Sequence, residues 1–292
     1  MKRWLWAAAL CLAACGGDAE ERRSREPVPA PRVELSAADR ERWTAAPATR
    51  TGVPVLLYSG VETDAFARQM ALLDHAGYET IELDELVRLV GEQDVSLPPR
   101  PFVLTFDGGR LETWTQSDGI LRGVGFSAVL FVDVGRIEAQ DPRYLTWDEL
   151  NRLQDSGRWD VQLQSGTADH EILYGPDPDD VGPSYAYRGT DEVLGGWRER
   201  TFSDITYGEE QLAHHVEGYR PLAFAPPGGN YGQAGTNDPR IPRLLLPRLE
   251  LSFDLVFTRD GAGFATSGAP NPLGRIRITP AESDEQLRAR VG

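Results

Sequence analysis

The sequence predicts an α/β domain built on a parallel sheet that is either open or closed into a barrel. Short apolar runs suited to buried strands alternate along the chain with segments whose apolar residues recur at helical spacing. Boundary residues agree with this alternation. Gly77 ends one helical segment, and Thr146 with Glu149 three positions later forms a capping box before another. The 292 residues suffice for one large domain or two small ones.

Each element is expected from its own pattern. Val53–Tyr58 is a continuous apolar run and therefore a buried strand, and Phe66, Met70 and Leu73 form the apolar face of the helix that follows. The same reasoning gives strands at residues 53–58, 79–83, 101–106, 126–132, 159–163, 222–225, 254–258 and 275–278, and helices at residues 65–75, 84–90, 146–155, 209–216, 243–251 and 282–291.

The N-terminus has the pattern of an export signal. Lys2 and Arg3 precede an apolar run, residues 4–12, that is too short to span a bilayer as a helix. The run leads into Leu-Ala-Ala-Cys15, which resembles a bacterial lipobox. We expect residues 1–14 to be removed as a lipoprotein signal peptide and Cys15 to carry lipid at the cell envelope, at the outer membrane or the periplasmic face. The alternative is a plain signal peptide in which the cysteine is incidental.

Two segments depart from the alternation of strands and helices. Residues 15–50 are rich in Ala, Glu, Arg and Pro and are expected to be a flexible tether before a domain over residues 51–292. Residues 171–205 are rich in Asp, Gly, Pro and aromatic residues and are expected to be a surface insertion that is functional or mobile. The aromatic residues there either stack on sugar rings or anchor the loop, and they are Tyr174, Tyr185, Tyr187 and Trp197.

Polar and glycine-rich segments follow four of the expected strands. Functional sites in parallel α/β folds lie at the carboxyl ends of the strands. The four segments are LYSG ending at Gly60, TFDGG ending at Gly109, QSGTADH ending at His170, and FAPPGGNY ending at Tyr231. We therefore expect these segments to meet at one end of the sheet.

Six segments, in this order, carry a resemblance to a known family: VPVLLYSG, PFVLTFDGG, YLTWDELNRLQDSGRWDVQLQSGTADH, PLAFAPPGGNYG, LVFTRDG and GRIRI. The chain resembles the polysaccharide deacetylases with a NodB homology domain (carbohydrate esterase family 4), in particular the branch that acts on exported N-acetylglucosamine polymers. The resemblance covers residues 53–290 and implies a deformed (β/α) barrel. It also implies a metal-dependent N-deacetylase. In that family a divalent ion, often zinc, is held by an aspartate and two histidines, another aspartate is the general base, and a backbone N–H stabilises the oxyanion.

The resemblance carries over to this sequence only in part. Asp107 stands at the general-base position and Gly228 at the oxyanion N–H position. Of the three metal positions, Gly108 and Gly166 lack a ligating side chain and only His170 remains. Because zinc sites need three or four ligands, we expect no cofactor, with zinc only if a replacement metal site exists. The groove positions implied by the resemblance are Tyr58, Ser165, Thr167 and Tyr231.

Three functions remain open at this point. The first is a catalytically impaired, envelope-anchored homologue that binds an N-acetylglucosamine-type polymer or a partner protein through the former substrate groove. The second is an active hydrolase of non-peptide carbon–nitrogen bonds that N-deacetylates a polysaccharide, with Asp107 and His170 in a rebuilt centre. The third is a structural lipoprotein. Asp107 as a helix cap and His170 as a hydrogen-bonded loop residue are the simpler roles for these two side chains.

The charge of the chain limits its partners. A formal net charge of −15 disfavours nucleic acid and anionic membrane surfaces, whereas a polymer with free amines is electrostatically permitted. The expected partners are an extracellular or periplasmic polysaccharide and, through the N-terminal lipid only, the membrane.

Overall fold

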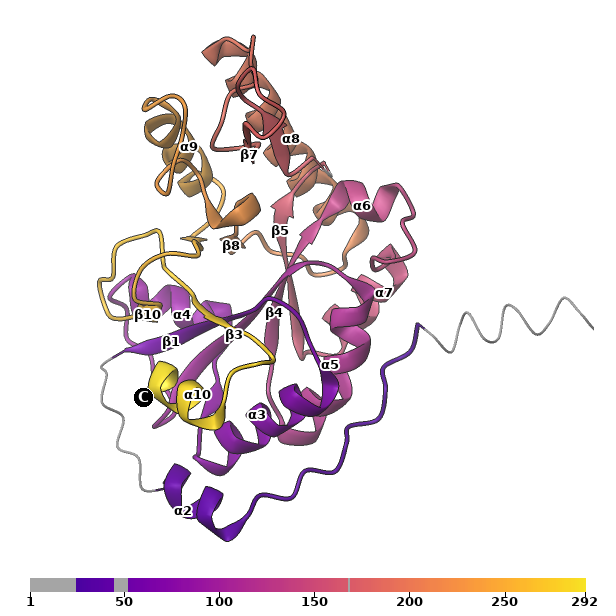
Figure 1. Ribbon diagram of the computed structural model, residues 1–292, viewed down its shortest axis with the longest axis vertical. Helices are drawn as coiled ribbons and strands as arrows, with labels where there is room; N and C mark the ends of the chain where they lie inside the picture. The colour runs from indigo at the N-terminus through magenta and orange to yellow at the C-terminus, as the bar shows by residue number, and fades with distance from the viewer. Residues whose placement is uncertain (1–24, 45–51, 168) are drawn as a thin grey trace, which may run out of the picture.

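Buried strands form the wall of a curled sheet. The computed structural model describes residues 25–44, 52–167 and 169–292, and its sheet has the strand order β10–β1–β3–β4–β5–β8–β9 (Figure 1). Along this order, the pairings that join β1, β3, β4, β5, β8 and β9 are parallel, as expected, and β10 is antiparallel to β1. The strands of this sheet are β1 (Val53–Tyr58), β2 (Glu79–Thr80), β3 (Pro101–Gly108), β4 (Ala128–Asp133), β5 (Trp159–Ser165), β8 (Ala223–Phe224), β9 (Leu255–Val256), β10 (Phe264–Ala265) and β11 (Ile276–Ile278).

A segment near the C-terminus links the two edges of the sheet. The N–H of Leu273 donates to the carbonyl of Val256 (2.8 Å), and the N–H of Thr258 donates back to the carbonyl of Leu273 (2.8 Å). Three residues further on, β11 pairs in parallel with β1. The sheet therefore curls into a deformed barrel, and the predicted fold class is confirmed.

Alternation along the strands separates an inner from an outer layer. Leu104 and Phe106 of β3 pack with the surrounding helices, whereas Val103 belongs to a second apolar cluster built mainly from inward-facing strand residues. By the same alternation, Thr105 and Asp107 face the interior, and Asp107 does so at the carboxyl end. The helices are α2 (Ala37–Thr44), α3 (Thr63–His75), α4 (Leu83–Val90), α5 (Leu111–Val124), α6 (Val134–Glu138), α7 (Trp147–Asp155), α8 (Leu194–His215), α9 (Ile241–Glu250) and α10 (Asp284–Val291).

Helices α5 and α8 are among those that differ from the sequence prediction. Helix α5 was not expected, because its sequence LETWTQSDGILRGV contains several weak helix formers. Burial of Trp114 and Leu121 against the barrel compensates for that weak propensity. Helix α8 begins well before the expected residue 209, inside the segment expected to be an insertion, and it buries Trp197 and Ile205.

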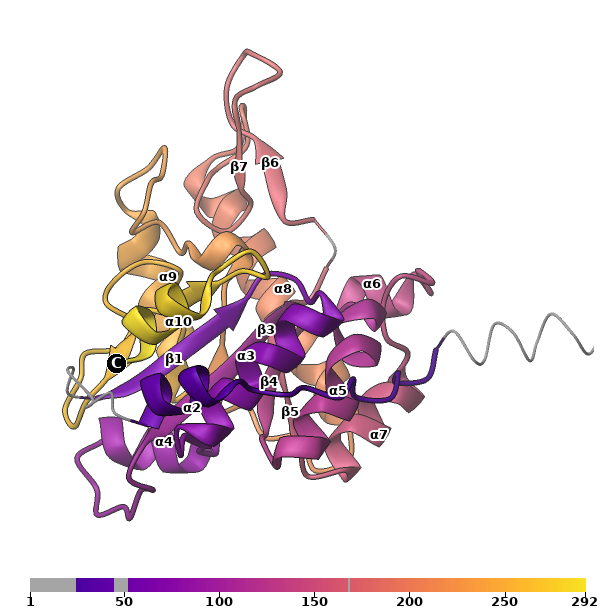
Figure 2. The ribbon, with the colours of Figure 1, turned by 60° about the horizontal axis from the view of Figure 1, so that its bottom comes forward.

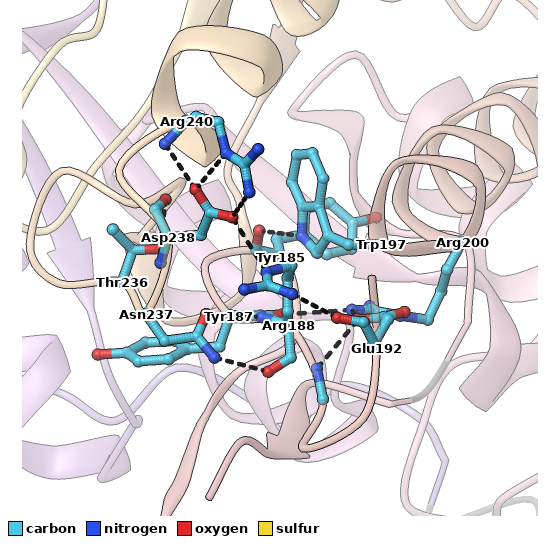
Figure 3. Close-up of polar contacts among 11 residues, drawn as sticks. Tyr185, Tyr187, Arg188, Glu192, Trp197, Arg200, Thr236, Asn237, Asp238 and Arg240 are labelled. Carbon is cyan, nitrogen blue, oxygen red and sulfur yellow. Dashed lines mark hydrogen bonds and ion pairs between the residues drawn. The ribbon is translucent and has the colours of Figure 1, made fainter. Parts of the chain in front are cut away.

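The rest of that insertion is a hairpin fastened to the body of the protein. Strands β6 (Glu171–Leu173) and β7 (Val181–Pro183) form a two-stranded sheet that projects beyond the barrel (Figure 2). Behind it, Arg200 binds both carboxylate oxygens of Glu192 (2.9 Å each), and Asp238 pairs with Arg188 (3.1 Å) and Arg240 (2.6 Å) (Figure 3). Of the aromatic residues in question, Tyr185 and Trp197 are buried anchors, whereas Tyr174 and Tyr187 are half-buried and stack on each other at 4.5 Å.

Residues 25–44 lie against the barrel, within the range expected to be a flexible tether. Arg25 forms an ion pair with Glu149 (2.5 Å), and the N–H of Val28 donates to the carbonyl of Thr115 (2.8 Å). Gly119 of α5 permits this crossing, because a Cβ there would meet the Val28 carbonyl oxygen at 2.5 Å. The apolar side chains that hold this segment against the barrel recur at no regular spacing along it. Its sequence therefore resembles that of a tether. The expected signal peptide and Cys15 lie outside the described residues, among which no helix is long and apolar enough to cross a membrane.

Docking of this segment makes a prediction about stability. Trp43 of α2 is only 1% exposed, so Trp43→Ala should lower the free energy of unfolding by about 3 kcal/mol in chemical denaturation. The control is Leu251→Ala, at a side chain 84% exposed, which should change stability by less than about 0.5 kcal/mol. An equally small effect of both substitutions would mean that the segment is a loose tether in solution.

Candidate functional site

Asp107 is held by two arginines at the carboxyl end of β3. Arg275 donates from Nη1 to Oδ1 (2.6 Å) and from Nη2 to Oδ2 (3.0 Å), which is a bidentate pair. Arg259 adds a third bond to Oδ2 (3.1 Å). Burial by itself would raise the pKa of Asp107, but the charges and hydrogen bonds of the two guanidinium groups outweigh it and hold the pKa below its ordinary value. Asp107 is therefore a fixed anion.

Arg275 is itself fixed inside the barrel. Its side chain is fully buried, with Nε donating to the carbonyl of Thr258 (3.2 Å) and Nη1 also reaching Thr105 Oγ1 (3.3 Å). Its guanidinium lies 5.4 Å from the ring centre of Phe131 and 6.0 Å from that of Phe257. This arginine cannot move away from Asp107 without losing several contacts.

His170 lies in a second network, beside Asp133 and Ser165. A register shift between β4 and β5 pairs Asp133 with Ser165 and brings both side chains to one face. Oδ1 of Asp133 lies 2.6 Å from His170 Nε2 and accepts a bond from the Ser165 hydroxyl (2.8 Å), and that hydroxyl lies 3.2 Å from the same Nε2. In a catalytic triad, the hydroxyl and the carboxylate engage opposite ring nitrogens. The arrangement is therefore a buried polar cluster without a poised nucleophile.

Charge coupling within this cluster shifts the pKa values of both partners. Burial raises the pKa of Asp133, although its bond to His170 opposes the shift. Burial also disfavours protonation of His170, but the hydrogen bond and charge of Asp133 outweigh it and raise the pKa of the imidazole.

Helix α8 covers the position of Gly166. A Cβ on Gly166 would lie 2.1 Å from the carbonyl oxygen of Asp204 and 3.0 Å from the N–H nitrogen of Gly208. The N–H of Gly166 donates to Asp204 Oδ2 (3.0 Å), which also accepts the hydroxyl of Tyr185. A larger side chain, such as the histidine implied by the family resemblance, does not fit between β5 and α8.

The two other glycine positions serve the backbone. Gly108 has a φ of +96°, and a Cβ there would point into open space. The exposed Gly228 stands in the turn after β8, and the next residue, Gly229, has a φ of +66°. A Cβ on Gly229 would lie 2.7 Å from the backbone nitrogen of Arg259, so this turn depends on glycine to pass close to that residue.

The expected groove residues differ in their exposure and surroundings. Tyr58 contributes to a cavity wall, but its ring packs on Phe66 (5.0 Å between ring centres) and its hydroxyl is buried without a partner among the described residues. Ser165 is buried in the cluster with Asp133, Thr167 is exposed, and Tyr231 is half-buried in the loop after β8.

These residues do not suit a divalent metal ion. Two guanidinium groups occupy the acceptor oxygens of Asp107, Gly108 and Gly166 have no side-chain donors, and His170 is bound to Asp133. Within the described part of the chain, no three His, Cys, Asp or Glu side chains are grouped closely enough to hold a metal. Positive charges beside Asp107 would also repel a cation.

A cavity of about 580 Å³ opens beside Asp107. Its wall includes Arg110, Arg259 and Arg277 besides Asp107, and His170 does not line it. These arginines were not predicted from the sequence as site residues, and neither were Arg275, Asp133 and Asp204. A charged residue at or just beyond the end of an apolar strand was an available signal for Asp133 and Arg259. Arg277 lies inside a strand and Asp204 on a helix, so neither had such a signal.

The crossing of α8 over β5 can be tested by a minimal substitution. Gly166→Ala should lower the free energy of unfolding by about 3 kcal/mol, because the added methyl group overlaps backbone atoms of Asp204. Gly123→Ala is the matched control, because Gly123 lies on an exposed turn of α5 with open space around it. This substitution should raise the free energy of unfolding by up to about 1 kcal/mol. Tolerance of alanine at Gly166 would show that α8 lies further from β5.

The ionised state of Asp107 predicts how stability depends on pH. A lowered pKa in the folded protein contributes stability above the unfolded-state pKa of about 3.9, and this contribution is lost as the pH falls through the lower folded-state value. Asp107→Asn should therefore cost about 3 kcal/mol near neutral pH and progressively less below about pH 4. Denaturation across this pH range checks the trend, with the exposed Asp155→Asn as control. A cost independent of pH would contradict the assignment.

Comparison with known proteins agrees with the fold. Residues 94–238 match the family model for polysaccharide deacetylase. No curated protein sequence matches the chain significantly. Among solved structures, a de-N-acetylase from Aggregatibacter actinomycetemcomitans has a TM-score of 0.69 at 15% identity, with 82% of this chain and 100% of that chain covered.

Two further structures show the same architecture. IcaB from Ammonifex degensii has a TM-score of 0.63 at 22% identity, over 82% of this chain and 97% of that chain. The deacetylase domain of BpsB from Bordetella bronchiseptica has a TM-score of 0.64 at 18% identity, over 78% and 96%. Residues 94–238 therefore match the polysaccharide deacetylase family, and the solved structures show that the chain shares the fold of these deacetylases.

Proposed function

We propose that this protein is an envelope-anchored member of the family that binds a polysaccharide through the cavity beside Asp107 and does not catalyse metal-dependent deacetylation. The observation that carries the proposal is the missing set of metal ligands, because Gly108 and Gly166 have no side-chain donors, α8 fills the space at Gly166 and His170 is bound to Asp133. A general base must be free to accept a proton from water, and a carboxylate whose pKa is lowered by two guanidinium groups is a poor proton acceptor. The cavity nevertheless has the size of a ligand site, roughly 300–1,000 Å³.

The competing proposal is an active hydrolase with a rebuilt centre of Asp107 and His170. The geometry argues against it, since the cavity beside Asp107 is not lined by His170, which is bound to Asp133. Asp107, the proton acceptor of this alternative, and His170 thus belong to two separate hydrogen-bond networks.

The test uses the full-length chain purified from membranes. After incubation with zinc and removal of free ions, metal analysis should find substoichiometric zinc, and N-acetylglucosamine oligomers should release no acetate above background. A metal-dependent deacetylase of the family, assayed alongside, is the positive control. Zinc-dependent acetate release would overturn the proposal, and release that is abolished by Asp107→Asn would establish the rebuilt centre instead.

Lipid attachment can be checked in the same preparation. The support for it is the lipobox-like sequence that ends at Cys15. Mass spectrometry should find an N-terminal peptide that begins at an acylated Cys15, whereas a mature chain that begins elsewhere without lipid would exclude the anchor.

A further inference from the structure

The cavity beside Asp107 carries an excess of positive charge. Arg110, Arg259 and Arg277 line it together with Asp107 and Glu112, and Arg275 lies directly behind Asp107. Four guanidinium groups thus face two carboxylates, in a chain whose formal net charge is −15. Such a local reversal of sign favours an anionic ligand.

Two of these arginines have no acidic partner among the described residues. Arg259 and Arg275 are both bound to Asp107, and Glu112 accepts a bond from Gln116 (3.2 Å). Arg110, by contrast, lies over the ring of Tyr144 at 5.5 Å, and Arg277 donates only from Nε, to Ser59 Oγ (2.9 Å). Terminal guanidinium N–H groups therefore remain available to a ligand, and they suit the two oxygens of a carboxylate.

Both arginines are placed by regular structure. Arg277 is the central residue of β11, pairs in register with Leu57 of β1 and stands between buried isoleucines. Arg110 is the N-cap of the 14-residue helix α5, whose first turn also lines the cavity and adds the positive end of the helix dipole. Arg277 also lines a neighbouring cavity of about 500 Å³, in which Arg290 is paired with Glu282 (3.0 Å), so the unpaired arginines face the first cavity.

We infer that the ligand of this cavity is an acidic saccharide, with a sugar carboxylate bound by Arg277 and Arg110. This inference rests on the proposed function and narrows it. Val61 and Pro280 give the same wall apolar surface for a sugar ring, while the arginines select against a polymer with free amines. The fixed Arg259–Asp107–Arg275 group forms the charged wall behind the ligand.

Calorimetric titration of the full-length chain with three hexasaccharides tests the inference. The first is a β-linked oligomer of uronic acid, the second a neutral oligomer of N-acetylglucosamine, and the third a cationic oligomer of glucosamine. The uronic acid oligomer should bind at least about tenfold more tightly than the neutral one, and the cationic one should not bind. Arg277→Gln and Arg110→Gln should each weaken the acidic ligand about tenfold without changing the affinity for the neutral oligomer. Added salt should weaken only the acidic ligand.

Arg243→Gln is the matched control, because Arg243 is an exposed residue of α9 outside both cavities. Equal affinity for acidic and neutral oligomers, or no effect of Arg277→Gln in a variant with unchanged thermal unfolding, would overturn the inference and leave the proposed function standing. Displacement of the acidic oligomer by inorganic phosphate at equal affinity would reduce the site to one for simple anions and would also overturn it. Failure to bind any of the three would instead refute the proposed function.

Discussion

The ion pair between Asp107 and Arg275 organises the open end of the barrel. Arg275 comes just before β11, so the contact that closes the sheet also delivers the guanidinium to the carboxylate at the end of β3. The glycine turn after β8 passes against Arg259, which completes the group. A buried ion pair is costly to break because the remaining charge has no partner. The ion pair of Asp107 with Arg275 therefore links the closing strand and the glycine turn to the chemistry of the site.

The crossing of α8 over β5 fixes the other side of the site. Gly166 and Gly208 allow the two backbones to approach closely, and Asp204 links the crossing to Tyr185 of the insertion. Helix α8 thus fills the space that a side chain at Gly166 would need. The ion pair of Arg188 with Asp238 joins the insertion to the loop after β8, and Arg200 pairs with Glu192 within it (Figure 3).

Charge is distributed unevenly in this protein. The excess of acidic residues gives the whole chain a repulsive field toward anions, yet the cavity wall beside Asp107 is dominated by arginines. Screening at physiological salt limits the field of exposed charges to about 8 Å, so a ligand within the cavity is governed by the arginines around it. Local charge, more than net charge, therefore decides which polymer can enter.

Local patterns in the sequence, such as the apolar run Val53–Tyr58 and the helical periodicity, determined an α/β domain with a parallel sheet, and the family resemblance implied its closure into a deformed barrel. It also placed Asp107 at a strand end, where side-chain alternation turns it inward. It did not identify helix α5, whose weak propensity is overcome by burial, nor the docking of residues 25–44, whose contacts are with distant segments. Only the tertiary structure showed that Asp107 is bound by Arg275 and that α8 fills the space at Gly166. Each of these depends on contacts between residues far apart in the chain, which no local pattern encodes.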